Sequence, residues 1–225
     1  ALLAGAAPVF IAAYWRYQSG EDVIPPNPGL DHAADFLAMF GLSFNAAAAR
    51  AMERYLITIA DHGMNASTFT ARVVASTQAG GGSSGVAALC ALKGPLHGGA
   101  PGPVLDMLDE IASEADVMPW IHAALEDGSR LMGFGHRVYR TSDPRADILK
   151  EIIGSLPRTS ERIALAEAVE NGVLNILVAR YPDRKLDTNV EFYTALVLDG
   201  IGLPRELFTS AFAMGRVIGW CAHIK

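Results

Sequence analysis

The spacing of the apolar residues constrains this chain more than any other feature. In most segments they recur every three or four positions, and alternation of β-branched or aromatic residues with polar ones is scarce. Such spacing places apolar side chains on one face of a helix. We therefore expect a mainly α fold, with helices over residues 1–18, 31–39, 46–59, 67–78, 86–92, 103–113, 118–127, 144–153, 160–181, 190–198 and 204–224.

Composition excludes several classes of protein. Hydrophobic residues make up 51% of the 225 residues and charged residues 19%, which indicates a packed core and not a disordered chain. The net charge of −6 argues against general binding to nucleic acid, because that binding needs a basic stripe facing the phosphates. Any anion site must therefore be local.

The first fourteen residues are apolar enough to suggest a secretory signal. They lack an initiating Met and a basic segment, and they are too short to span a bilayer. We expect a buried helix here and no membrane partner. The missing Met predicts that further residues precede Ala1.

Cys90 and Cys221 lie far apart and lack the spacing of metal ligands. They favour reduced, buried thiols in a cytoplasmic protein, with a single disulfide as the open alternative. The histidines form no HxH or HxxxH pair, so no metal site is expected. The Gly-rich run at residues 80–85 is typical of a flexible linker and lacks the Gly-Lys-Ser/Thr of a phosphate loop.

Three histidines have settings that suggest chemistry. His97 is flanked by Gly and Pro, which favour a loop apex or helix start; an ordinary loop histidine is the alternative. His136 lies in a short stretch with Arg140 and Arg145, which predicts a local anion site or else a solvated basic loop. His62 lies between two predicted helices, where a capping or core role is the more common interpretation for a histidine taken alone.

Two charges fall within otherwise apolar helical segments. Glu191 follows Val190, and Arg216 lies in the last predicted helix. A charge is costly to bury without a partner or a task. Either the two neutralise each other, or both face a polar cleft.

Four segments, in this order, resemble the citrate synthase family: residues 61–63, 92–100, 133–139 with 143–145, and 189–193. The resemblance implies an almost entirely helical fold with a large domain, residues 1–100 and 197–225. It also implies a smaller mobile domain, residues 101–196, that closes over substrate, and a homodimer that completes each site.

The resemblance implies an acyltransferase of the tricarboxylic acid cycle that condenses acetyl-CoA with oxaloacetate and water, giving citrate and CoA without a cofactor or a metal. It implies that His97 stabilises the enolate of acetyl-CoA, that Glu191 is the base and that His136 donates to the oxaloacetate carbonyl. The implied oxaloacetate-binding residues are His62, Arg145 and Arg216, and the implied CoA-binding residues are Met132, Gly133, Phe134, Gly135 and Arg140.

Two alternatives stay open on the same residues. A 2-methylcitrate synthase would use propionyl-CoA, and a non-catalytic homologue would only bind CoA or carboxylates. Glu191 stands where the family usually has Asp, and residues 80–85 fall where the family has a continuous helix at its dimer interface. The resemblance also implies that the chain lacks segments at both ends.

Overall fold

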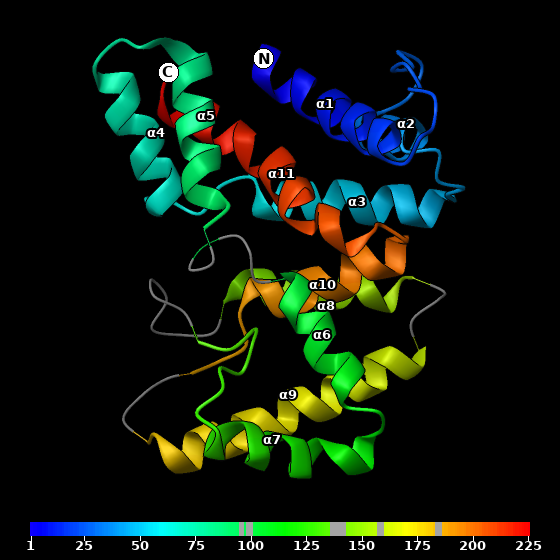
Figure 1. Cartoon of the computed structure of the whole chain (residues 1–225), viewed down its shortest axis with the longest axis vertical. Helices are drawn as coiled ribbons and strands as arrows, with labels where there is room; N and C mark the ends of the chain where they lie inside the picture. The colour runs from blue at the N-terminus through cyan, green and yellow to red at the C-terminus, as the bar shows by residue number, and fades with distance from the viewer. Residues whose placement is uncertain (95–96, 98–100, 136–142, 157–159, 183–185) are drawn as a thin grey trace. The chain divides into compact units, whose positions relative to one another are not determined.

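The computed structural model describes residues 1–94, 97, 101–135, 143–156, 160–182 and 186–225. These residues form helices and no strand, which confirms the mainly α class (Figure 1). The helices are α1 (Leu2–Gln18), α2 (His32–Met39), α3 (Ala46–Ile59), α4 (Ala66–Ser76), α5 (Gly80–Leu92), α6 (Pro101–Glu110), α7 (Val117–Glu126), α8 (Pro144–Gly154), α9 (Ser160–Arg180), α10 (Val190–Ile201) and α11 (Phe208–His223). Short 3₁₀ turns precede α7 and α11, at Glu114–Asp116 and Arg205–Leu207.

Side-chain caps fix the start of several helices. The Asn45 side chain accepts from the backbone N–H of Ala48 at the start of α3, and Asn65 accepts from Thr68 at the start of α4. Asp143 caps α8, with Pro144 in the first turn. Each cap satisfies a backbone donor that the helix itself leaves without a partner.

The chain divides into two compact units. Unit 1 comprises Ala1–Gly99 and Ile201–Lys225, and unit 2 comprises Ala100–Gly200. The domain limits expected from the resemblance were 1–100 with 197–225, and 101–196. The return of the chain to unit 1 thus falls at the end of α10, a few residues later than expected.

In unit 1, α11 packs against α1 and α3 (Figure 1). Two glycines of α11 face the end of α3 at very short range. A Cβ atom at Gly219 would lie 2.2 Å from the carbonyl oxygen of Ala60, and one at Gly215 would lie 2.7 Å from Ile59. Only hydrogen fits at these positions, so the glycines set the distance between the two helices.

The expectation of a flexible linker at residues 80–85 was wrong. These residues form the first half of α5, which packs along α4 (Figure 1). Ser84 is fully buried and its hydroxyl donates to the carbonyl of Gly80. Glycine costs about 1 kcal/mol in a helix, but tertiary packing overrides this propensity.

Two expectations of burial were also wrong. Helix α1 buries only Pro8 and Ala12 and exposes Leu2 and Phe10. Cys90 is exposed, because α5 buries Ser84, Ala88 and Leu92, one turn apart, and Cys90 lies on the opposite side. Both cysteines are free.

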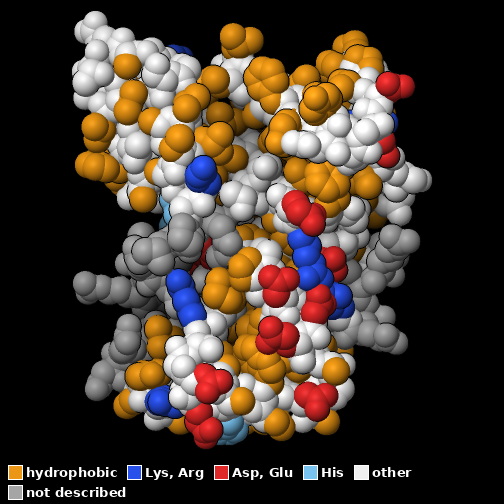
Figure 2. All heavy atoms as spheres, in the orientation of Figure 1, with side chains coloured by type: hydrophobic (Ala, Val, Ile, Leu, Met, Phe, Trp, Pro, Cys, Tyr) orange, Lys and Arg blue, Asp and Glu red, His pale blue; other side chains and the backbone are white. Residues whose placement is uncertain are grey.

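On the face shown in Figure 2, hydrophobic side chains are prominent on unit 1, whereas Asp and Glu are frequent on unit 2. The exposed hydrophobic residues of unit 1 include Phe69 and Val73 of α4 and Val86 and Leu89 of α5. Within the described part of the chain, no helix is long and apolar enough to cross a membrane.

Candidate active site

His97 follows α5 in unit 1 and is half-buried. Its backbone N–H donates to the carbonyl of Gly94, which holds the turn. Its ring atom Nε2 lies 3.3 Å from the backbone nitrogen of Ser67 and 2.9 Å from the Ser67 hydroxyl. A backbone N–H can only donate, so Nε2 acts as an acceptor and Nδ1 carries the ring proton.

Ser67 is itself held in place from two other elements. It is fully buried at the start of α4. Its hydroxyl lies 2.8 Å from the side-chain oxygen of Asn65 and accepts from the indole N–H of Trp220 in α11 at 3.1 Å. The orientation of the His97 ring thus depends on both α4 and α11.

His97 is biased toward the neutral form. Burial lowers the pKa of its imidazole, and the positive charge of Arg216 lowers that pKa further. A neutral imidazole with a proton on Nδ1 is a hydrogen-bond donor that carries no charge of its own. Such a group can stabilise negative charge that develops on a carbonyl oxygen.

Arg216 is almost completely buried in α11, with 1% of its surface exposed. Its Nε donates to the carbonyl of Ile59 at 2.7 Å, and its guanidinium lies 4.8 Å from the centre of the Phe212 ring. Ile59 is the last residue of α3. The close approach of α3 and α11 therefore fixes the position of this charge.

His62 is half-buried in the loop between α3 and α4. Its neighbour Asp61 lies 3.0 Å from Nε2 of His223, near the end of α11. Burial raises the pKa of Asp61, but hydrogen bonds from the backbone of His62 and Gly63 and from His223 outweigh it and lower the pKa. The Asp61 carboxylate therefore ties the loop that carries His62 to α11.

Arg145 in unit 2 forms a buried ion pair with Asp143. Its Nε and Nη2 donate to the two carboxylate oxygens at 2.9 and 2.7 Å, and its backbone N–H donates to Oδ1 at 3.0 Å. Asp143 is 2% exposed and Arg145 is 7% exposed. The bidentate geometry holds the guanidinium plane in one orientation.

Asp143 also contacts α10, which carries Glu191. Its Oδ2 accepts from the backbone N–H of Val190 at 3.2 Å. Glu191 is half-buried in the first turn of α10, and its backbone N–H donates to the side chain of Asn189 at 3.0 Å. One buried carboxylate thus joins Arg145 to the start of the helix that bears Glu191.

The segment Met132–Gly135 lies beside the same helix start. The backbone N–H of Asn189 donates to the carbonyl of Gly133, and its side chain donates to the carbonyl of Gly135, both at 2.9 Å. Gly133 has a φ of +86°, and a Cβ atom there would lie 2.7 Å from Phe192. This tight turn requires glycine.

Comparison with known proteins decides the family. The sequence model of the citrate synthase C-terminal domain matches residues 1–225. The chain belongs to the citrate synthase family.

Individual relatives agree with this assignment. The citrate synthase of Deinococcus radiodurans is 40% identical over 218 residues, covering 95% of this chain and 57% of the relative. The crystal structure of the Thermotoga maritima citrate synthase has a TM-score of 0.87 and 38% identity, covering 97% of this chain and 59% of that one. The chain spans about half the length of the curated relatives it matches.

A third relative was solved with ligands. It is a ternary complex of carboxymethyl coenzyme A and oxaloacetate with the citrate synthase from Thermoplasma acidophilum. Its TM-score is 0.89 at 33% identity, covering 99% of this chain and 59% of that one.

The structure distributes the predicted residues of this citrate synthase family member over both units. His62, His97 and Arg216 lie in unit 1, whereas Arg145, Glu191 and the Met132–Gly135 segment lie in unit 2. His136 and Arg140 lie outside the described residues.

Two residues that contact the predicted ones were not expected from the sequence. Ser67 holds the His97 ring, and Asp143 holds Arg145. The Asp143-Pro144-Arg145 order could have revealed the second, since Asp before Pro is typical of a helix cap. Ser67 gives no such signal, because its partner lies thirty positions away in the chain.

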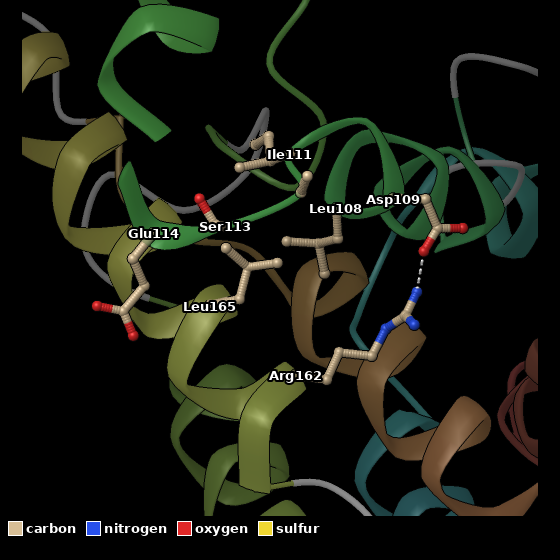
Figure 3. A pocket seen from close by; sticks show the side chains of 8 residues that line it. Leu108, Asp109, Ile111, Ser113, Glu114, Arg162 and Leu165 are labelled. Carbon is tan, nitrogen blue, oxygen red and sulfur yellow. Dashed lines mark hydrogen bonds and ion pairs between the residues drawn. The ribbon is translucent and has the colours of Figure 1, made fainter. Parts of the chain in front are cut away.

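The surface of unit 2 also has hollows. One, of about 340 Å³, includes Met132 in its wall with Trp120 and Arg130. Another, of about 350 Å³, lies between α6 and α9 beside the ion pair of Arg162 and Asp109 (Figure 3). None of the predicted site residues that the structure describes lines the latter hollow. Among the described residues, no group of three or more His, Cys, Asp or Glu is placed to hold a metal.

Proposed function

We propose that the full-length protein condenses acetyl-CoA with oxaloacetate and water, giving citrate and CoA. The observation that carries this proposal is His97: burial and Arg216 lower its pKa and so favour the neutral imidazole, and its Nε2 accepts from the backbone N–H of Ser67, which leaves the ring proton on Nδ1. Membership of the citrate synthase family supports the same reaction, as does the oxaloacetate and carboxymethyl coenzyme A complex of the Thermoplasma relative.

In the first step, the Glu191 carboxylate removes a proton from the methyl carbon of acetyl-CoA. The electron pair of that C–H bond moves into the new C=C bond, and negative charge develops on the thioester oxygen. The Nδ1–H group of His97 donates a hydrogen bond to that oxygen. A thioester α-proton is weakly acidic, so base and donor must act together.

In the second step, the enolate carbon attacks the carbonyl carbon of oxaloacetate and forms the new C–C bond. His136 donates a proton to the carbonyl oxygen as it becomes a hydroxyl group. Water then cleaves the resulting citryl thioester, which releases citrate and CoA. No metal or cofactor takes part, so we expect turnover to persist in the presence of a chelator.

Arginine and histidine side chains would bind the anionic groups of the substrates. His62, Arg145 and Arg216 would hold the oxaloacetate carboxylates, and Arg140 with Met132–Gly135 would hold CoA. The rigid mounting of Arg145 on Asp143 suits carboxylate binding, since a guanidinium of fixed orientation loses little entropy when it binds.

The decisive experiment measures release of free CoA by full-length protein supplied with oxaloacetate and either acetyl-CoA or propionyl-CoA. We expect a higher kcat/KM with acetyl-CoA, although one methylene changes selectivity by only about 1 to 3 kcal/mol. A preference for propionyl-CoA would identify a 2-methylcitrate synthase. Binding of both ligands without CoA release would identify a non-catalytic homologue and overturn the proposal.

Glu191→Gln tests the base. The amide keeps nearly the same shape but cannot accept the proton, so we expect kcat to fall at least about 100-fold with oxaloacetate affinity retained. Glu206→Gln, an exposed carboxylate in unit 1, is the matched control. Unchanged turnover in Glu191→Gln would exclude Glu191 as the base, even though the family usually has Asp at this position.

We also infer a homodimer in the cytoplasm. Support for the dimer comes from the apolar side chains exposed on α4 and α5, where Phe69 is 59% exposed and Val86 is 62% exposed. Exposed apolar residues that gather on neighbouring elements are typical of protein interfaces. Free cysteines are consistent with a reducing compartment.

A further inference from the structure

The Glu170 carboxylate in α9 binds both sides of the segment that carries Glu191. Its Oε1 accepts from the hydroxyl of Thr188 at 2.7 Å, and its Oε2 accepts from the hydroxyl of Tyr193 at 2.6 Å. Lys150 of α8 donates to the same Oε2 at 3.2 Å. The Glu170 side chain is 13% exposed, so these contacts are largely shielded from water.

Both hydroxyl partners of Glu170 are buried. Thr188 is 7% exposed and Tyr193 is 2% exposed. Burial raises the pKa of the Tyr193 phenol, and its hydrogen bond to Glu170 raises that pKa further, so the phenol stays a proton donor. Removing the partner of a buried hydroxyl lowers the stability of the folded protein, because the hydroxyl loses a hydrogen bond that water cannot replace.

Glu191 lies between these two anchors. Thr188 immediately precedes Asn189, whose side chain caps the backbone N–H of Glu191, and Tyr193 follows Glu191 by two positions. Val190 is also tied to Asp143. The two bonds to Glu170 therefore oppose sliding or rotation of the first turn of α10.

We propose that Glu170 is a positioning residue, which holds the first turn of α10 so that the Glu191 carboxylate keeps its place. This inference rests on the proposed role of Glu191 as the base. A displacement of about 1 Å in a reacting group can cost about 100-fold in rate. Glu170 bonds to Thr188, Tyr193 and Lys150, and none of these is a proposed oxaloacetate-binding residue. Loss of Glu170 should therefore lower kcat and leave oxaloacetate binding intact.

The test compares Glu170→Gln with Glu167→Gln in the full-length protein. Glu167 lies one turn earlier in α9, also pairs with Lys150, and is 47% exposed. We expect Glu170→Gln to lower kcat about 10- to 100-fold with KM for oxaloacetate within about twofold. Glu167→Gln should leave both values close to those of wild type.

Tyr193→Phe and Thr188→Val each remove one anchor and guard against a Glu170 variant that does not fold. We expect each to lower kcat several-fold, and the effect of Glu170→Gln to shrink when it is combined with Tyr193→Phe. Equal losses of kcat and oxaloacetate affinity in the folded variants, or full turnover in all of them, would overturn the inference.

Hydrogen–deuterium exchange separates this inference from the proposed reaction. We expect the amides of residues 188–193 to exchange at least about tenfold faster in Glu170→Gln than in wild type or Glu167→Gln. If wild-type protein releases no CoA, the proposed function fails, and exchange alone decides the positioning role. Unchanged exchange in this segment would refute it.

Discussion

Ser67 contacts the imidazole of His97 through both its backbone N–H and its hydroxyl. The two contacts meet at Nε2, so the other ring nitrogen is the one available to a substrate carbonyl. Trp220 and Asn65 hold the hydroxyl in turn. A single histidine in a Gly-rich loop thereby acquires a defined tautomer.

His97→Ala should remove this donor. We expect kcat to fall about 100- to 1,000-fold, the typical cost of losing one oxyanion donor, with oxaloacetate affinity changed far less. The measurement is thioester cleavage by the full-length variant, with His122→Ala, an exposed histidine of α7, as control. Unchanged turnover would show that His97 is not the hydrogen-bond donor.

The depressed pKa of His97 predicts a pH dependence of stability. Its folded pKa lies below the ordinary value of 6.5, so the unfolded chain binds more protons as the pH falls below that value. The contribution of His97 to stability is therefore present above pH 6.5 and is lost on acidification. Urea unfolding between about pH 5 and 8 should show that wild type loses more stability than His97→Gln; parallel curves would contradict this.

Asp143→Asn should destabilise unit 2 and weaken oxaloacetate binding. Removing one partner of a buried ion pair typically costs about 3 to 5 kcal/mol, because the remaining charge loses its counter-ion. Chemical denaturation and calorimetric titration with oxaloacetate measure the two effects. Asp147 is an exposed acid in the first turn of the same helix, and Asp147→Asn should change neither the stability of unit 2 nor the affinity for oxaloacetate by much. Wild-type affinity in Asp143→Asn would contradict this role.

At the scale of elements, glycine decides where α11 can lie. Gly219→Ala would place a methyl group 2.2 Å from the carbonyl oxygen of Ala60, and backbone cannot move aside as a side chain can. We expect a loss of at least about 2 kcal/mol in unfolding free energy. Because Arg216 bonds to Ile59 in the same contact, substrate binding should weaken as well.

Gly5→Ala is the matched control for Gly219→Ala. Gly5 lies within α1, and no atom of the described residues lies within 4 Å of the point that an alanine methyl group would occupy there. Alanine should therefore stabilise the helix by up to about 1 kcal/mol. Thermal unfolding of both variants provides the comparison. If the two substitutions shift Tm alike, close packing of α11 against α3 is not what requires glycine.

For the whole molecule, the apolar surface of α4 and α5 predicts self-association. Phe69→Glu and Val86→Glu should each weaken the proposed dimer at least about tenfold, since a buried charge opposes association. Val178→Glu, at a similarly exposed apolar position in unit 2, should leave the dimer affinity unchanged. Analytical ultracentrifugation of the full-length proteins measures the monomer–dimer equilibrium, and a monomeric wild type would refute the dimer.

The helices were predictable because their signal is local. The predicted limits of α3 match the observed ones, and α8 and α9 differ by one residue at their ends. The Gly-rich start of α5 was not predictable, because its helical state depends on packing along α4. The exposure of Cys90 was missed for the same reason, since its environment depends on which face of α5 packs.

The sequence by itself determined the helical class, the family and the identity of the candidate site residues, because periodicity and motifs are properties of neighbouring positions. Only the tertiary structure decided the chemistry of those residues. Burial and Arg216 lower the pKa of His97 and so favour its neutral form, Ser67 sets its tautomer, Asp143 orients Arg145, and Glu170 anchors the segment around Glu191. The contacts of Ser67 with His97 and of Glu170 with Tyr193 join groups that the sequence separates and folding brings within 3 Å, where burial strengthens their interaction.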